Sequence, residues 1–534
     1  MEDTMINQEH TPSLEINESK NEKSNERKKF FRRPDLDVMT RLTIAFTAII
    51  AMAENQRGTI TRLAKEYFIS RTFVYMLAKS LMDQSQIKFA DYCTPVLQEK
   101  SYLEHILFLR LEGKCSIETI SSYLKRFGFD NSSTGYISQI LNDIGSELSN
   151  TQSFNEGDEI KVIFASDEIF AKKAPIMITV DPISTAILKI ELLDKRTAEA
   201  WISHWESIEE NGCIPIYLVC DGGTALAKAH DEFLPDLIKQ LDTYHAIAHI
   251  LGVIDRQLEK AACDAIEKEY ASNVIIGGAN FEESKIQRLM IKYEENKKKA
   301  QDLIDRYDSF HYLYISILKE LEIFDETGKL RKRQTAEENI EACLELLETE
   351  LGYEKQVKKI RRFMGDLLNY FEIAEVILEE LQAKKPELSK EVLEAVCLAW
   401  QWGKKKVKAK ESNRKKFCAA KEKYYYGVAE QKSSGVFDEI KEQIIKELDE
   451  IVQSSSIVEC INSIVRPYIN NTKSQISQEL LNLIMFYHNH RRYKAGKRKG
   501  KTPHEILTGQ TQTKDWLDLL VETYEKEQAL KHLK

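Results

Sequence analysis

Short apolar runs separated by polar breaks stand out between residues 160 and 242. Three β-branched runs, IKVIFASDEIF, PIMITVDP and AILKIELLD, are bounded by Pro, Gly and Asp, which predicts three strands. They follow one another too closely for crossover helices, so we expect antiparallel neighbours. A helical pattern at Thr197–Gly212, an all-apolar strand at Ile214–Cys220, a helix from about Thr224 and a short strand ending near Asp242 come next. This order predicts an α/β layer built on a mixed sheet.

Ahead of this region the periodicity is helical. Residues 37–83 include RGTITRLAKEYFISRTFVYMLAKSL, in which Thr59 would cap one helix, a tight turn falls at Phe68–Ser70, and Arg71–Leu81 forms a second helix. This spacing predicts a helix-turn-helix unit, although small three-helix units also serve as structural spacers. The residues expected to face DNA at the start of the second helix are Ser70, Arg71, Thr72 and Tyr75.

A weaker copy of the same pattern follows in KCSIETISSYLKRFGFDNSSTGYISQILNDIG. A Gly-Phe-Asp-Asn turn separates two helical stretches, the second beginning at about Ser133. DNA binding and a structural spacer account for this unit equally well. Residues 1–33 are polar with few aromatics, so they predict a flexible leader, whose basic end could also touch phosphate.

From Asp242 to Glu459 the pattern is almost entirely helical, which predicts a long all-α insertion. Its most basic stretch, WQWGKKKVKAKESNRKKFCAAKEKYYYG, interleaves cations with aromatic residues. Such a stretch clamps a DNA strand in one interpretation, and is a solvated helix with inward aromatics in the other. The tail carries a second basic cluster before a helix that Thr502 would cap, and it either touches DNA or packs behind the Glu459 helix. The candidate DNA contacts are Lys404, Lys405, Lys406, Arg414, Arg491, Arg492, Lys497 and Arg498.

Two acids follow apolar runs of the predicted sheet. Asp167 comes after Ile160–Ala165 and Asp221 after Ile214–Cys220. If these strands are neighbours, the carboxylates meet at one edge, where burial without a cation is costly. Mg²⁺ suits such a place because it takes oxygen ligands from one or two carboxylates and from phosphates. A third acid, Glu459, lies in a helical segment whose apolar stripe we expect to be Ile457, Cys460, Ile461, Ile464 and Val465.

Taken in order, these elements resemble the catalytic domain of DDE transposases of bacterial insertion sequences, which has the RNase H-like fold. The strings FASDEIF, VCDGGTALAKAH, SSSIVECINSIVRPYI and FYHNHRRYKAGKRKGKTPHEILTG add to the resemblance, which covers the chain from about Ile160 onward. The resemblance implies that Asp167, Asp221 and Glu459 are catalytic and hold two Mg²⁺ or Mn²⁺ ions. It implies cleavage of DNA at the ends of a mobile element and transfer of the strand to target DNA.

The resemblance extends to partners and to a second pair of residues. It implies binding to double-stranded DNA, assembly as a homodimer or larger complex on that DNA, no small-molecule cofactor, no membrane, and a bacterial cytoplasmic location. Asp242-Thr243-Tyr244-His245 resembles the Asp/Cys-x-x-His motif of transposases with helical insertions, which would place His245 near the metals. We expect His249 to make a structural hydrogen bond, and Glu168 to face away from the site.

Two other functions remain open. One is a domesticated helix-turn-helix regulator that binds DNA but has lost catalysis, and the other is a structure-selective nuclease of the RNase H-like fold. A strand-end aspartate that caps the next helix is the structural alternative for the acids, and it fits Asp221, before Gly222-Gly223, better than Asp167.

Composition changes this picture little. A chain of 534 residues is long enough for several domains, and its net charge of −9 hides local clusters of Lys and Arg. Nine cysteines without a CxxC pair predict free thiols in a reducing compartment, and the longest apolar segment, Leu42–Ala53, is too short to span a bilayer. We therefore expect a multidomain α+β protein. The expected parts are a tail (1–33), a helix-turn-helix domain (34–90), a second helical unit (91–155), an RNase H-like mixed-sheet core (156–255 and 451–510), an all-helical insertion (256–450) and a C-terminal helix (511–534).

Overall fold

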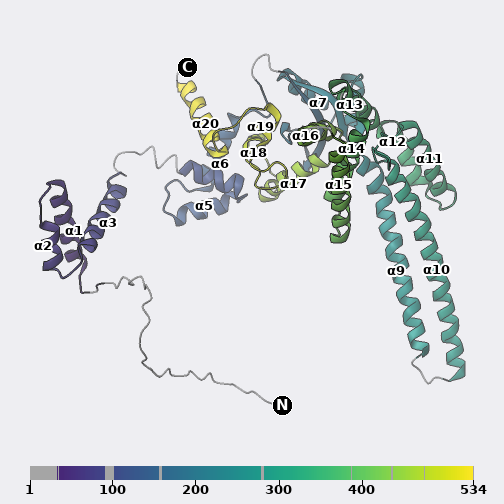
Figure 1. Ribbon diagram of the computed structural model, residues 1–534, viewed down its shortest axis with the longest axis horizontal. Coiled ribbons are helices and arrows are strands. Elements are labelled where there is room, and N and C mark those ends of the chain that lie inside the picture. Colours follow the sequence, from purple (N-terminus) through teal and green to yellow (C-terminus); the bar gives the residue numbers. More distant parts are fainter. Residues whose placement is uncertain are drawn as a thin grey trace. The chain divides into compact units, whose positions relative to one another are not determined.

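The computed structural model describes residues 33, 35–90, 102–154, 159–277, 282–386, 388–433, 437–473 and 475–532. The chain divides into two compact units, Met1–Lys100 and Ser101–Lys534. Its class is α+β, predominantly helical, with one mixed five-stranded sheet in the described residues (Figure 1). No helix in these ranges is both long and apolar enough to cross a membrane. The predicted leader lies outside the described residues except for Arg33.

The first unit is a three-helix bundle. Its core consists of Ile44, Ala48, Leu63, Ala64, Val74 and Ala78. Thr59 does not cap its helix as expected, because Gly58 takes the cap position in a left-handed conformation (φ 89°) and Thr59 is the first helical residue. The third helix also runs beyond Leu81. The helices are α1 (Val38–Ala53), α2 (Thr59–Glu66) and α3 (Arg71–Ala90).

The sheet has the order β3-β2-β1-β4-β5. β1 pairs antiparallel with β2, and β2 with β3, so the predicted meander is confirmed; β4 and β5 continue the sheet in parallel. β1 is longer than expected, and Asp167 lies inside it opposite Ile178 rather than after its end. The strands are β1 (Ile160–Ala171), β2 (Ala174–Val180), β3 (Ile187–Leu192), β4 (Cys213–Cys220) and β5 (Lys239–Leu241).

Alternation along β1 buries both faces of the sheet. Val162 and Phe164 pack on one side against Trp201 and Trp205, from α7 (Ala198–Glu210), with α8 (Thr224–Phe233) beside it. Ile163 and Ala165 pack on the other side. That side is covered by α17 (Ser456–Asn471), α18 (Gln478–His490) and α20 (Trp516–His532).

The second helical unit belongs to this same core. Residues 102–107 are helical and continue into η1 (Phe108–Glu112), α5 (Ile117–Arg126) and α6 (Thr134–Ser146). Tyr468 Oη donates to Leu111 O at 2.6 Å, and Asn482 Nδ2 donates to Gly145 O at 3.0 Å. Ser133 caps α6 as its position predicted. These contacts give the unit a packing role, and its DNA binding stays a prediction.

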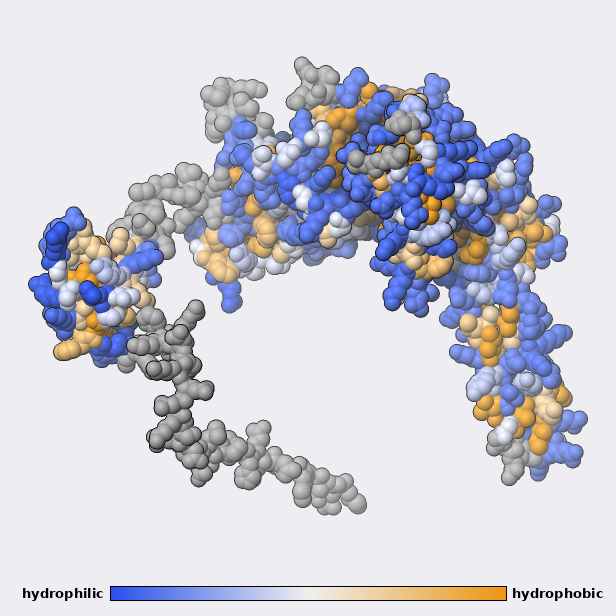
Figure 2. Space-filling model, viewed as in Figure 1, coloured by the Kyte–Doolittle hydropathy of each residue, from blue (hydrophilic) through white to orange (hydrophobic). Residues whose placement is uncertain are grey.

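Between β5 and α17 the described chain is helical apart from its connections, in keeping with the predicted insertion. α9 and α10 run side by side as a long antiparallel pair (Figure 1). Leu251, Phe310 and Ile317 anchor one end of the pair in the insertion core, whereas Tyr270 and Met290 are exposed further along, where orange residues mark the pair in Figure 2. The helices are α9 (His249–Gly277), α10 (Glu283–Glu320), α11 (Arg333–Thr349), α12 (Glu354–Leu367), α13 (Tyr370–Lys384), α14 (Lys390–Lys408), α15 (Ser412–Lys432) and α16 (Phe437–Asp449).

Candidate functional site

The first two acids lie side by side on neighbouring parallel strands. Ser166 is paired with Cys220, so Asp167 and Asp221 are the next residues on β1 and beyond β4. Asp167 Oδ1 accepts from Glu168 N at 2.8 Å, and Asp221 Oδ1 accepts from Gly223 N at 3.1 Å. Burial raises the pKa of Asp167 to about 7; the Glu168 N–H opposes this rise, and the charges of Asp221 and Glu459 add to it. The strands have thus gathered negative charge at one place.

The third acid comes from the opposite end of the chain. Glu459 is in the first turn of α17, its side chain is 43% exposed, and its Oε2 lies 3.6 Å from Arg466 Nη2. Three residues further along the same helix, Asn462 Nδ2 donates to Asp167 Oδ2 at 3.1 Å. Residues three apart share a helix face, so Glu459 and Asn462 lie on the same side of α17, although the Glu459 carboxylate points toward Arg466.

Sequence reasoning missed Asn462, although its spacing from Glu459 was a usable signal. Its Oδ1 is buried and has no hydrogen-bond partner among the described residues. The predicted apolar stripe was partly wrong. Ile461 and Val465 are buried, but Cys460 is exposed and Val458 is buried in its stead. Val458, Ile461 and Val465 already form a complete i, i+3, i+7 stripe against the sheet, which turns Cys460 to the solvent side.

Asp242 joins the end of the sheet to the start of α17. Its Oδ1 accepts from Tyr244 N at 2.7 Å and His245 N at 3.0 Å. Its Oδ2 accepts from Ser455 N at 2.8 Å and Ser455 Oγ at 2.7 Å. Burial works to raise the pKa of Asp242, but contacts from His245 and Ser455 outweigh it and the pKa is lowered. Through these bonds Asp242 fixes the helix that carries Glu459.

His245 faces the same negative charge. Its Nδ1 lies 3.2 Å from Asp242 Oδ2 and forms an ion pair when protonated, but the angle at the ring nitrogen does not suit a hydrogen bond. Asp242 raises the pKa of His245, burial opposes the rise, and the charges of Asp167 and Asp221 add to it. The predicted placement of His245 near the acids therefore agrees with the structure. His249 is exposed, and the described residues provide no hydrogen bond for the structural role expected of it.

The turn after Asp221 is covered by the insertion. A Cβ on Gly222 would lie 2.6 Å from Phe363 Cε1 of α12, so only glycine fits there without movement. Gln240 in β5 ties the same helix down, because its Nε2 donates to Leu367 O at 2.8 Å. On the other side of the site, Glu168 forms an ion pair with Arg196, as expected of a residue that faces away from Asp167.

The three acids have the ligand chemistry that a hard divalent cation requires. Carboxylate oxygens are its preferred ligands, and the raised pKa of Asp167 reflects burial and unneutralised neighbouring charges. As the side chains stand, however, no three His, Cys, Asp or Glu residues of the described ranges are grouped to hold a metal ion. Glu459, turned toward Arg466, is the side chain that has to move for the set to close.

The four predicted DNA-facing residues of α3 are all exposed. Ser70 Oγ accepts from Phe73 N at 3.1 Å and so caps the helix, while Arg71, Thr72 and Tyr75 follow on its open face. The preceding turn passes through Phe68, whose φ of 51° reverses the chain between α2 and α3. These residues are exposed, and their contact with DNA stays a prediction.

The basic stretch of the insertion is largely engaged within the protein. Lys405 pairs with Glu322 at 2.6 Å, and Lys406 pairs with Glu422. Lys404 lies over the ring of Trp400, which is buried and donates to Asp449. Trp400 therefore packs inward, whereas Tyr424 and Phe417 are exposed, so the choice between the two alternatives stays open. Arg414, on α15, is exposed and has no ion pair in the described residues.

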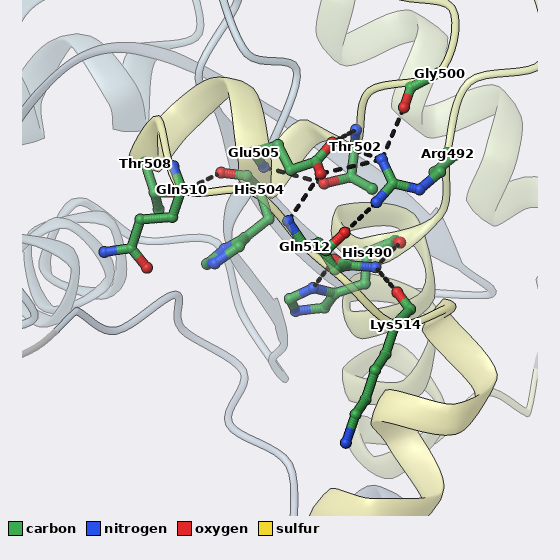
Figure 3. Close-up of polar contacts among 10 residues, drawn as sticks. All are labelled: His490, Arg492, Gly500, Thr502, His504, Glu505, Thr508, Gln510, Gln512 and Lys514. Carbon is green, nitrogen blue, oxygen red and sulfur yellow. Dashed lines mark hydrogen bonds and ion pairs between the residues drawn. The ribbon is translucent and has the colours of Figure 1, made fainter.

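Cations of the tail make contacts both within the tail and with the core, and those of Arg492 are drawn in Figure 3. Arg492 donates to Gly500 O at 2.7 Å and pairs with Glu505 at 2.8 Å. Glu505 also completes a capping box with Thr502 at the start of α19 (Pro503–Thr508), which confirms the predicted cap at Thr502. Arg491 stacks over Tyr487, Lys497 pairs with Asp449 at 2.9 Å, and Arg498 donates to Ile183 O at 2.9 Å.

Comparison with known proteins adds no relative: no protein-family model matches this chain, and neither does any curated protein. The functional argument therefore stands on the arrangement of the residues themselves.

Proposed function

We propose that this chain is a DDE-type transposase with an RNase H-like core, which cleaves DNA at the ends of a mobile element and transfers the strand to target DNA. One observation carries the proposal: Asp167 and Asp221 lie side by side on parallel strands, and Glu459 is near enough to add to the raised pKa of Asp167. Asp167, Asp221 and, once it turns away from Arg466, Glu459 would together hold Mg²⁺ or Mn²⁺ against a phosphate.

The sheet supports the RNase H-like assignment. A three-stranded antiparallel meander is extended by two parallel strands, with the first acid on the central strand and the second just after its parallel neighbour. The third acid then returns on a helix after a long insertion. The exposed start of α3 in the first unit supports DNA binding, because a recognition helix reads base edges from this position.

Each residue of the site has a part in this proposal. Asp167, Asp221 and Glu459 hold the divalent cations, which when bound activate water and steady the leaving oxygen at phosphorus. Asn462 keeps the Asp167 carboxylate turned toward the site, and Asp242 keeps the Glu459 helix in place. His245, whose pKa is raised by Asp242, is the group placed to donate a proton or a hydrogen bond to a phosphate oxygen of the bound strand.

Strand transfer by Glu459→Gln tests the proposal. The substrate is a labelled oligonucleotide of the element end, taken from DNA flanking the gene, in Mg²⁺ or Mn²⁺. We expect cleavage and joining by the unmodified protein and by Glu442→Gln, an exposed matched control on α16, and neither reaction by Glu459→Gln. End binding should be the same in all three proteins.

The other outcomes are equally informative. Tight end binding without chemistry from any of the proteins would contradict the proposal and favour the catalytically silent regulator. Cleavage without joining would favour the structure-selective nuclease. Full activity of Glu459→Gln would remove Glu459 from the set of metal ligands.

A further inference from the structure

A cavity of about 500 Å³ opens beside the start of α17, between parts of the chain that are distant in sequence. Its walls come from the end of α14, the segment joining α16 to α17, the turn between β2 and β3, and the tail before α19. The sequence assigned Lys404 to one basic stretch and Lys497 and Arg498 to another. The fold brings all three into this one cavity, together with Lys408 and Lys501.

The cavity is strongly cationic. Five basic side chains line it against a single carboxylate, Asp449, which is already engaged by Lys497 and by the Trp400 indole. Arg498 donates to backbone carbonyl groups, which orient its guanidinium without neutralising it. Lys408 and Lys501 are exposed at the rim and form no ion pair within the described residues. The cavity is therefore built for an anion.

Lys404 lies deepest among these cations. Its Nζ is 3.9 Å from the centroid of the Trp400 ring and 3.5 Å from Ile451 O, and no carboxylate in the described part of the chain forms an ion pair with it. Burial lowers the pKa of Lys404 to about 8, although Asp449 opposes this. A buried ammonium in this condition is stabilised by an incoming negative group, since the desolvation of its charge is then compensated.

The remaining walls suit the rest of a nucleotide. Ser454 and Ser456 offer hydroxyl groups, and Ile183, Val452, Ile457 and Ile506 form an apolar side. A volume of this size lies within the range of small-ligand sites, roughly 300–1,000 Å³. Ser456 precedes Glu459 by three residues on α17, one helical turn. A strand held here therefore passes close to the proposed catalytic acids.

We propose that this cavity binds a backbone phosphate of a single DNA strand, with the adjoining sugar against the isoleucine wall, and so fixes the strand beside Glu459. The identification of the ligand as DNA rests on the proposed function, whereas the anion site rests on the five cations alone. A mononucleotide or free phosphate carries the same anionic group and could occupy the cavity instead, so the test must distinguish these ligands from a DNA strand.

The test measures binding of a labelled single-stranded oligonucleotide in EDTA, where no chemistry occurs. The protein with Lys408→Gln and Lys501→Gln is compared with a matched control, Lys415→Gln and Lys416→Gln, which removes the same charge from exposed positions on α15 outside the cavity. We expect roughly tenfold weaker binding for the cavity variant. The slope of its salt dependence should also become shallower, by about 0.7 for each phosphate that the variant no longer binds. The control should change less on both measures.

A chemical footprint gives a second, independent reading. Lys404 lines the cavity and its pKa is lowered to about 8, so a small acetylating reagent that enters the cavity should modify it. The oligonucleotide should protect Lys404, whereas pyrophosphate or a deoxynucleoside monophosphate should protect it only at far higher concentration. Protection by a mononucleotide at the concentration of the oligonucleotide would overturn the strand assignment in favour of a free nucleotide. Equally weakened binding in the cavity and control variants, or an unprotected Lys404, would overturn the site.

Failure of this inference and of the proposed function can be told apart. If the unmodified protein transfers strands and the cavity variant binds and reacts just as well, the cavity is not a DNA site and the proposed transposase activity stands. If the unmodified protein never cuts DNA but the cavity variant loses strand binding, the cavity is a DNA site and the proposed transposase activity is wrong.

Discussion

Replacing Asp167 by asparagine should stabilise the metal-free protein while abolishing its proposed activity. The carboxylate is partly buried beside two other acids, and its pKa is raised from 3.8 to about 7. When Asp167 is charged, a rise of this size lowers the free energy of unfolding by about 4 kcal/mol. Relaxation and partial exposure bring this down to about 2–4 kcal/mol. Asparagine has a similar shape but no charge, so it should recover most of that amount.

The hydrogen bonds around residue 167 can adapt to the change. In Asp167→Asn the side-chain oxygen can still accept from Glu168 N, while the new amide group would face the amide donor of Asn462. Rotation of Asn462 presents its Oδ1, which has no partner in the described residues, as the acceptor that the new amide needs. The substitution therefore need not leave a buried donor unsatisfied.

The sign of the pH dependence follows from proton binding. Between pH 3.8 and about 7 the folded protein holds a proton on Asp167 that the unfolded chain has released, so stability falls as pH rises and the loss is complete above about 7. The advantage of Asp167→Asn should thus be largest at pH 8 and shrink by more than half at pH 5.

Thermal unfolding in EDTA provides the measurement. For a unit of the size of Ser101–Lys534, about 0.9 kcal/mol corresponds to one degree, so the midpoint should rise by about 2–4 °C at pH 8. Adding Mg²⁺ should stabilise the unmodified protein and not the variant. Asp236→Asn, on the exposed connection after α8, is the matched control and should change neither. The electrostatic reasoning would be refuted if Asp167→Asn were less stable than the unmodified protein at pH 8, or if its gain in stability were the same at pH 8 and pH 5.

Three further predictions concern the surroundings of the acids. Asp242→Asn turns an amide toward the two Ser455 donors and should cost about 2–4 kcal/mol, read from the denaturant midpoint; an unchanged midpoint would show that Asp242 does not fix α17. Gly222→Ala should cost about 1–3 kcal/mol through its clash with Phe363, and adding Phe363→Leu should restore part of that stability. If the effects of the two substitutions simply add in a double-mutant cycle, Gly222 and Phe363 are not in contact. His245→Gln should slow strand transfer without weakening end binding. The fall in rate that we expect above the raised pKa of His245 should then disappear, and a retained fall would assign it to another group.

Local patterns in the sequence predicted much of the core. Strand alternation and the turn residues gave the meander, and Asp167 and Asp221 could be paired because each follows an apolar run in the same sheet. Contacts between distant segments could not be predicted in this way. Asn462 meets Asp167 across 295 residues, and Lys404 shares a cavity with Lys497 only because α14 and the tail pack beside α17. Neither contact leaves a periodic trace along the chain.

Local sequence is a poor guide to the role of a residue when that role depends on a neighbouring side chain or backbone. Thr59 has the chemistry of a cap, but Gly58 reaches the left-handed conformation needed there more easily. Lys405 and Lys406 look like a phosphate clamp in isolation, whereas Glu322, just after α10, and Glu422, on α15, take up their charges. Charge clusters in a sequence therefore overstate the cationic surface that a fold leaves open.

The strands of the sheet precede the helical insertion in the sequence, and the helices that cover one face of the sheet follow it. The order of synthesis therefore leaves that face uncovered for a time. Ile163, Ala165 and Val219 on one face are covered by α17 and α18, which the ribosome makes only after the whole insertion. At about 5–20 residues per second, that interval lasts roughly a quarter of a minute to a minute. Throughout it a nascent chain displays an uncovered apolar sheet to chaperones and to other unfinished chains. We therefore expect the yield of folded protein to depend on how many nascent chains avoid aggregation during that interval.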